Sequence, residues 1–195
     1  MTDLYLVRHG ETEWSKSGQH TSITDLPLTP EGVRQATSLN GVLNPQDFDL
    51  VLCSPRLRAQ ETARLAGFDH FEVDEDLAEW FYGDFEGKTS AAIREFVPGW
   101  RIWRSHVPNG EQQADVVGRL SRVMNRVRYS GAKRAICFGH GHALRVLAMC
   151  WIDIDIRHGA AFPLATATVS TLGYEKETAA LRQWNARPGD AGMLV

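Results

Sequence analysis

The chain contains 195 residues, of which 43% are hydrophobic and 23% are charged, a balance typical of a globular protein and not of a disordered, collagenous or coiled-coil chain. Its length corresponds to one domain that can bury a full core without disulfide bonds. The 21 basic and 24 acidic side chains give a net charge of −3, so the chain as a whole does not attract nucleic acid or anionic membranes, and an anion site requires local positive charge.

Apolar runs alternate with amphipathic segments along the chain, which predicts strands and helices in turn. The first helix is expected from Thr29, which can cap it, with Pro30 in the first turn, to about Leu43. The second is expected to open at Ser54-Pro55 by the same logic. Further helices are predicted over 110–129 and 143–152, and strands over 4–8, 50–53, 71–73, 135–138, 167–174 and 180–184. This order predicts an α/β fold, a single three-layer domain whose mostly parallel sheet has helices on both faces.

The segment 74–109 interrupts this alternation and is rich in aromatic residues, namely Trp80, Phe81, Tyr82, Phe85, Trp100 and Trp103. A long insertion of this kind is more often a lid or a pocket wall than a plain connection. It could equally be a satellite apolar cluster over the sheet, and both descriptions can hold. We therefore predict a single domain over 1–195 with an aromatic-rich insertion at about 74–109.

The cysteines and the apolar runs indicate the compartment. Cys53, Cys137 and Cys150 are scattered in apolar stretches without ligand spacing, which predicts buried free thiols in a reducing compartment and not a redox or zinc site. The apolar run 146–152 is far shorter than the roughly 20 residues of a membrane-spanning helix. We therefore expect a cytoplasmic protein with no membrane or nucleic-acid partner, and we leave its oligomeric state open.

Polar side chains follow four of the predicted strands at their carboxyl ends, where ligands bind in open α/β sheets. They are Arg8, His9, Glu11, Ser54, Arg58, Glu79, His140 and His142. Each alone has a structural explanation: a histidine at a strand end is more often a structural residue than a catalyst, and Arg58 could be a solvated helix arginine. Arg58, however, shares a helix face with Ser54 and Thr62 near the start of its helix. Because four strand ends each contribute a group, we interpret them as one site.

This set of groups fits phosphate chemistry. Two arginines and a helix start match the geometry of a phosphate group. No acidic cluster suggests a Mg²⁺ site there, so arginine and protonated histidine would have to neutralise the phosphate. A neutral imidazole can attack phosphorus and form a phosphohistidine. The leaving alcohol needs a proton, and Glu79, beside Trp80 and Phe81, is placed to carry one because desolvation favours the neutral carboxyl group.

Four motifs in chain order resemble those of the histidine phosphatase (phosphoglycerate-mutase-like) superfamily, over nearly the whole chain. They are Leu6-Val7-Arg8-His9-Gly10-Glu11-Thr12, Ser54-Pro55-Arg56-Leu57-Arg58-Ala59 with Thr62-Ala63, Glu79 with Gly83 and Glu86-Gly87, and Gly139-His140-Gly141. The resemblance implies that His9 is the nucleophile that becomes phosphorylated. It implies that Arg8, Arg58 and His140 bind the phosphoryl group, with His140 cationic. It also implies that Glu79 donates the proton and then activates water, and that the reaction needs no metal and no cofactor.

Further segments are similar to superfamily phosphatases related to sedoheptulose bisphosphatase and to actinobacterial acid phosphatases: 12–21, 24–29, 79–84, 103–104 with 109–111, and 139–145. The chain departs from phosphoglycerate mutases because it is shorter and lacks their paired-arginine insertion after the acid motif. The resemblance therefore implies a metal-independent phosphatase of small phosphate monoesters, with sugar phosphates favoured. The alternative is a phosphoglycerate mutase, in which the same phosphohistidine returns its phosphoryl group to the substrate. A third hypothesis, a phosphate-dependent binding module, would need a missing site group, and none is missing.

Substrate selection is expected to lie in the loop after His9 and in the insertion. One wall would contain Trp14, Gln19, His20 and Thr21, and another Trp80, Tyr82, Trp100 and Trp103. Arg101 and Arg104 are candidates for a second phosphate, although they could equally be exposed helix charges with their stems on aromatic rings. His142 could shape the pocket, with a structural role at the helix start as the favoured alternative. The expected partner is a small phosphorylated metabolite.

Overall fold

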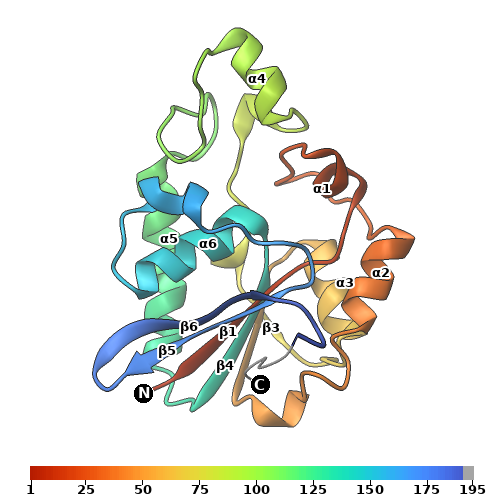
Figure 1. Ribbon diagram of the computed structural model, residues 1–195, viewed down its shortest axis with the longest axis vertical. Coiled ribbons are helices and arrows are strands. Elements are labelled where there is room, and N and C mark those ends of the chain that lie inside the picture. The colour runs from red at the N-terminus through yellow and green to blue at the C-terminus, as the bar shows by residue number, and fades with distance from the viewer. Residues whose placement is uncertain (191–195) are drawn as a thin grey trace.

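The computed structural model describes residues 1–190 of the chain. At its centre is a six-stranded sheet of order β3-β2-β4-β1-β5-β6 (Figure 1). The first four strands in this order are parallel, whereas β5 is antiparallel to both of its neighbours. The strands are β1 (Asp3–Arg8), β2 (Leu50–Cys53), β3 (Glu72–Val73), β4 (Arg134–Gly139), β5 (Val169–Glu175) and β6 (Thr178–Ala186). The sheet is therefore mostly parallel, as predicted.

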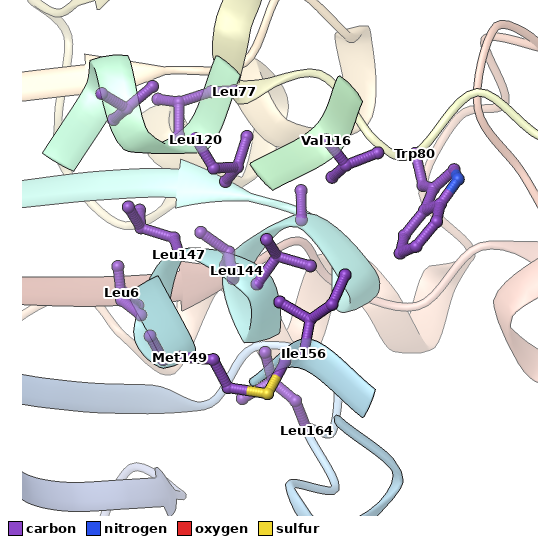
Figure 2. Close-up of a cluster of buried hydrophobic side chains, with 14 of the residues drawn as sticks. Leu6, Leu77, Trp80, Val116, Leu120, Leu144, Leu147, Met149, Ile156 and Leu164 are labelled. Atoms are coloured by element: carbon purple, nitrogen blue, oxygen red, sulfur yellow. The ribbon is translucent and has the colours of Figure 1, made fainter. Parts of the chain in front are cut away.

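Helices cover both faces of this sheet, which gives the three-layer α/β architecture predicted from the sequence (Figure 1). They are α1 (Glu13–Ser17), α2 (Pro30–Thr37), α3 (Leu57–Leu65), α4 (Ser90–Phe96), α5 (Gln113–Arg128) and α6 (Gly141–Trp151). Alternate side chains of β1 enter two separate cores: Leu4 and Leu6 pack with α5 and α6, and Tyr5 and Val7 pack with α3. Figure 2 shows part of the first core.

The helix α2 is shorter than the predicted helix, because it ends at Thr37 and not near Leu43. The chain then forms turns that contain Gly41 with a φ of +83°, a left-handed conformation that interrupts a helix and favours glycine. Leu39 and Leu43 are nevertheless buried and fill the core from these turns. The predicted helix was therefore too long at its C-terminal end, where the core residues lie on turns.

The helix α3 begins at Leu57, three residues after the predicted opening at Ser54. The Leu57 N–H donates to the carboxylate of Asp25 at 2.9 Å, so the residue that satisfies the helix start comes from a distant loop. Asp25 lies 32 positions away, and a local sequence pattern cannot show this contact. The helix α6 begins at Gly141, with His140 as its N-cap residue, directly after β4.

The insertion over 74–109 contains α4 and short 3-10 turns. Trp80, Trp100, Trp103 and Tyr82 are buried in the larger core, and Tyr82 also lines a cavity. The insertion is thus both an apolar cluster and a pocket wall. In Figure 1, α4 and α1 stand above the sheet, on the side at which the parallel strands end. The last five residues of the predicted domain, 191–195, lie outside the described part of the chain.

The cysteines are free thiols: Cys53 and Cys137 are buried and Cys150 is half-buried. Burial raises the pKa of the Cys53 thiol to about 12. Over residues 1–190, no helix combines the length and the apolar character that crossing a bilayer requires.

Candidate active site

A cavity of about 270 Å³ lies where β1 and β4 end. The end of β1 contributes Arg8 and His9 to its lining, and the start of α6 contributes Gly141, His142 and Arg145. The segment after β1 contributes Ser15 of α1 and the residues Gly18, Gln19, His20 and Thr21 that follow this helix, and the insertion contributes Glu79, Tyr82 and Ser90. Three of the five predicted catalytic residues, Arg8, His9 and Glu79, therefore line one cavity. The side chains of the other two, Arg58 and His140, are fully buried and are not part of its lining.

His9 is held in one orientation and one protonation state. Its backbone N–H donates to the carbonyl of Gly139 at 3.0 Å, and its ring Nδ1 lies 2.7 Å from the carbonyl oxygen of Gly10. A carbonyl oxygen only accepts hydrogen bonds, so Nδ1 carries the proton and Nε2 keeps its lone pair. Burial, and next the charges of Arg58 and Arg8, hold the pKa of His9 well below its usual value. The ring is therefore a neutral imidazole with an unprotonated nitrogen.

The turn after His9 depends on close contact between two backbones. A Cβ atom at Gly10 would lie 2.5 Å from the carbonyl oxygen of Gly32 in α2. Only glycine allows this approach. The Gly10 N–H also donates to the hydroxyl of Thr62 in α3 at 2.9 Å. The backbone that carries His9 is thus fixed against two helices.

His140 stands beside His9, with a distance of 5.2 Å between the ring centroids. Its Nε2 lies 2.6 Å from the hydroxyl oxygen of Ser54, and its buried Nδ1 has no hydrogen-bond partner among residues 1–190. Burial, and next the charges of Arg58 and His9, hold the pKa of His140 well below its usual value. The surrounding protein therefore favours neutral His140, and the cation expected from the sequence requires a nearby anion.

The two predicted phosphate-binding arginines have different surroundings. Arg8 donates to the carbonyl of Leu164, and Gly141 packs so closely that a Cβ there would lie 3.3 Å from the Arg8 guanidinium carbon. Arg58 donates to the carbonyl oxygens of Thr21, Ser22 and Thr24. The Nε of each arginine is buried and has no hydrogen-bond partner in the described part of the chain. Each guanidinium is thus oriented by backbone carbonyls.

Glu79 is buried at the cavity wall, with 7% of its surface exposed. Its Oε1 accepts from the N–H groups of Trp80 and Ala143, both at 2.8 Å, and its Oε2 accepts from the N–H of His142 at 3.0 Å. Two of these donors belong to the first turn of α6. The apolar setting expected from Trp80 and Phe81 is therefore only part of its environment, because backbone donors fix the carboxyl group.

The predicted substrate wall is partly assembled. Gln19, Thr21, Tyr82 and His142 all line the cavity. The hydroxyl of Tyr82 lies 2.6 Å from His142 Nδ1. Burial raises the pKa of Tyr82 and lowers that of His142, so both groups are neutral and a single proton is shared between the Tyr82 oxygen and His142 Nδ1.

Trp80, Trp100 and Trp103, which were predicted to form one wall, lie in the larger core and not in the cavity lining, and three further predicted substrate residues also lie away from the cavity. The Trp14 indole packs against Gly87, where a Cβ would lie 3.0 Å from the ring. Arg101 and Arg104 are exposed on the insertion. None of these three side chains belongs to the cavity lining. The expectation that Arg101 and Arg104 receive a second phosphate is therefore not supported, because Ile102 and Trp103 turn into the core and leave the flanking arginines in solvent.

The sequence prediction did not assign Arg145 to substrate binding. Its guanidinium lies over the Trp103 ring, 4.5 Å from the centroid, and donates to the carbonyl of Gly159. Burial lowers the pKa of Arg145 to about 10, which leaves it charged at neutral pH. Arg145 follows His142 by three positions, and this helical spacing could have placed both on one face of α6.

His20 forms an aromatic group with other cavity residues. Its ring lies 4.6 Å from that of Tyr82 and 5.8 Å from that of His142, and its Nε2 lies 3.2 Å from the Ser90 hydroxyl. Burial lowers the pKa of His20 to about 4, so this ring is neutral as well.

Known proteins share both this sequence pattern and this fold. The family model described as "Histidine phosphatase superfamily (branch 1)" matches residues 4–187. An acid phosphatase of Mycobacterium tuberculosis is 38% identical over 175 residues, which are 88% of this chain and 86% of that protein. Sedoheptulose 1,7-bisphosphatase of Saccharomyces cerevisiae is 39% identical over 184 residues, 78% of this chain and 68% of that protein. The solved structure of open reading frame Rv3214 from Mycobacterium tuberculosis has a TM-score of 0.91 at 35% identity, covering 96% of this chain and 98% of that chain.

Proposed function

The chain belongs to the histidine phosphatase superfamily and is a hydrolase of phosphate esters, and we propose that it cleaves small phosphate monoesters through a phosphohistidine formed on His9. The observation that carries this proposal is the contact between His9 Nδ1 and the Gly10 carbonyl oxygen. It leaves the lone pair of Nε2 available in a cavity that also contains Arg8 and Glu79.

In the first step, the substrate phosphate lies against Arg8, with the buried Arg58 and His140 adding positive charge. His9 Nε2 attacks phosphorus as the bond to the ester oxygen breaks, and Glu79 gives its proton to that oxygen. Oε2 of Glu79 accepts only one N–H, which leaves a position on this oxygen for the proton. His140 takes up a proton more readily once the phosphate is bound, because the anion offsets the charge of Arg58.

In the second step, Glu79 is a carboxylate and removes a proton from a water molecule that attacks phosphorus. The bond between phosphorus and His9 breaks, inorganic phosphate leaves, and Glu79 again holds a proton. Arginine side chains supply the positive charge for both steps, so we propose that the reaction needs no metal ion. The expected rate is unchanged by EDTA.

The substrate class that we propose is a sugar phosphate. The yeast relative is named for a sugar bisphosphate, and the cavity wall carries hydrogen-bonding groups on Gln19, Thr21, Tyr82 and His142. Arg145 is the candidate for a second anionic group, in place of Arg101 and Arg104, because it alone of the three lines the cavity.

Replacement of His9 by alanine tests the proposal. The variant is expected to lose hydrolysis of para-nitrophenyl phosphate by at least about a thousandfold and to lose acid-labile labelling by radioactive phosphate, because no other residue is assigned to form the intermediate. The matched control is His106→Ala, which changes an exposed histidine of the insertion. Unchanged hydrolysis in the His9 variant contradicts the nucleophile assignment. Conversion of 3-phosphoglycerate to 2-phosphoglycerate at rates above hydrolysis would instead favour the mutase alternative.

A further inference from the structure

The loop over 21–25 lies between two opposite charges. On one side, both carboxylate oxygens of Glu86 accept from the N–H of Ser22, at 2.8 and 3.0 Å, and Oε1 also accepts from the N–H of Thr24 at 3.1 Å. On the other side, Arg58 donates to the carbonyl oxygens of Thr21, Ser22 and Thr24 at 3.1 to 3.3 Å. The loop therefore turns its amide groups to an anion and its carbonyl groups to a cation, and charge-assisted hydrogen bonds hold both sides.

This loop continues directly from the cavity wall. Gln19, His20 and Thr21 line the cavity, and Thr21 is also the first residue held by Arg58. The two residues after Glu86 also hold this wall through their backbone. The Gly87 N–H donates to the His20 carbonyl at 2.8 Å, and the His20 N–H donates to the Lys88 carbonyl at 3.0 Å. The wall and the residues that hold it are thus one hydrogen-bonded unit.

Glu86 is not part of the cavity lining, so it does not meet a substrate that occupies the cavity. Its carboxylate forms hydrogen bonds to the backbone of Ser22 and Thr24, next to the wall. A glutamine cannot reproduce this arrangement, because its amide NH₂ would replace an acceptor oxygen that lies within 3.0 Å of the Ser22 N–H. A carboxylate, both of whose oxygens accept, therefore suits a position where two backbone N–H groups converge.

We propose that Glu86 is a positioning residue of the active site, which holds the loop over 21–25 against Arg58 and thereby fixes the wall formed by Gln19, His20 and Thr21. The inference rests on the proposed function, because the wall matters only if the cavity binds a phosphate ester. Glu86 then sets how firmly the leaving-group side of the substrate is bound, whereas the phosphate group lies against Arg8 and His9, whose hydrogen bonds do not involve the loop over 21–25.

Two probes separate these contributions. In Glu86→Gln, the KM for para-nitrophenyl phosphate, whose leaving group is an aryl ring, is expected to rise about tenfold, the equivalent of one charge-assisted hydrogen bond. The kcat for this substrate and the inhibition constant for inorganic phosphate are expected to stay within about threefold. Glu86→Ala is expected to show a larger increase in KM. Asp84→Asn, which alters an exposed carboxylate of the same segment that accepts from Asn109, is the matched control and is expected to leave KM unchanged.

Hydrogen exchange at single amides gives a second readout that needs no turnover. The Ser22 and Thr24 amides are expected to exchange at least about tenfold faster in Glu86→Gln than in the parent protein, while the thermal midpoint of the whole domain stays within a few degrees. Equal exchange rates at both amides, or a KM within twofold of the parent value, overturns the positioning role. A parent protein that hydrolyses no phosphate ester overturns the proposed function instead, and the exchange rates still decide the role of Glu86.

Discussion

Replacing Arg145 by methionine separates the binding of a second anionic group from the chemistry at His9. Methionine keeps an unbranched apolar stem of similar length and removes the charge. Arg145 is one of the residues that line the cavity, and its guanidinium is held over the Trp103 ring, 4.5 Å from its centroid. Arg101→Met is the matched control, because Arg101 is an exposed arginine of the insertion.

The expected magnitude follows from the contact that is lost. A charge-assisted hydrogen bond from a guanidinium to a phosphate contributes about 1.5–3 kcal/mol, which corresponds to about a tenfold to 150-fold change in affinity. The KM for fructose 1,6-bisphosphate is therefore expected to rise by this factor in Arg145→Met, while the KM for para-nitrophenyl phosphate, with a single anionic group, stays within about twofold. Equal increases for both substrates, or a similar increase in Arg101→Met, would refute the assignment of Arg145 to a second anion.

The effect of this replacement on folding is expected to be small, because opposing contributions nearly cancel. The pKa of Arg145 is lowered from 12.5 to about 10, so the folded state disfavours the charged form at every pH below 10. The shift corresponds to at most about 3 kcal/mol, and to about 1 kcal/mol after solvent screening of this partly exposed side chain. Methionine relieves that cost and loses a cation–π contact and a hydrogen bond, each of about 1 kcal/mol. The free energy of unfolding is therefore expected to fall by no more than about 1–2 kcal/mol, and global unfolding of the variant would contradict this reasoning.

Three further predictions concern the same site. Burial holds the pKa of His9, His20, His140 and His142 below 6.5, so the unfolded chain binds more protons than the folded one. The free energy of unfolding is therefore expected to fall as the pH drops below about 6.5, by up to about 1.4 kcal/mol per pH unit for each histidine. Equal urea midpoints at pH 7.5 and 5.5 would refute this prediction. Ser54→Ala removes the hydroxyl that lies 2.6 Å from the buried Nε2 of His140. This replacement is expected to lower the free energy of unfolding by about 1–3 kcal/mol and to reduce kcat. If both values are unchanged, the contact does not have this role. Gly159→Ala places a Cβ 2.4 Å from the Trp103 ring, so it is expected to lower the free energy of unfolding by about 1–3 kcal/mol. It is also expected to weaken selectivity for a bisphosphate, because it displaces the ring under Arg145. Retained stability together with retained selectivity would show that the ring adapts.

Sequence reasoning located the groups that directly follow strands, because parallel strands end at one edge and bring their following residues together. Arg8 and His9 after β1, and His142 after β4, do line one cavity. The same reasoning did not place residues whose position depends on how the insertion folds. Arg101 and Arg104 flank Ile102 and Trp103, whose burial turns the two arginines outward, and no local pattern records which side of a loop enters the core.

Contacts between distant segments explain what else the sequence could not show. Helical spacing predicts Arg58 on the face of α3 that points to the site, but its partners are carbonyl groups of the loop over 21–25, more than 30 positions earlier in the chain. The sequence indicates no role for Glu86 beyond its place in a motif, although its carboxylate holds the same loop from the other side. Residue type and spacing therefore indicate which charges a site contains, whereas their partners follow only from the fold.

The hydrogen-bond partners of the cavity arginines explain why the cavity keeps the positive charge that an anion needs. Arg119 shows the structural alternative, because it forms a two-pronged pair with the carboxylate of Glu111 at 2.7 and 2.9 Å, which neutralises its charge. Arg8 and Arg145 form no ion pair among residues 1–190 and donate instead to the carbonyls of Leu164 and Gly159. A carbonyl oxygen orients a guanidinium without cancelling its charge, so the positive potential stays in the cavity at a cost in folding free energy. A carboxylate in place of either carbonyl would orient the arginine equally well and would remove the reason for a phosphate to bind there.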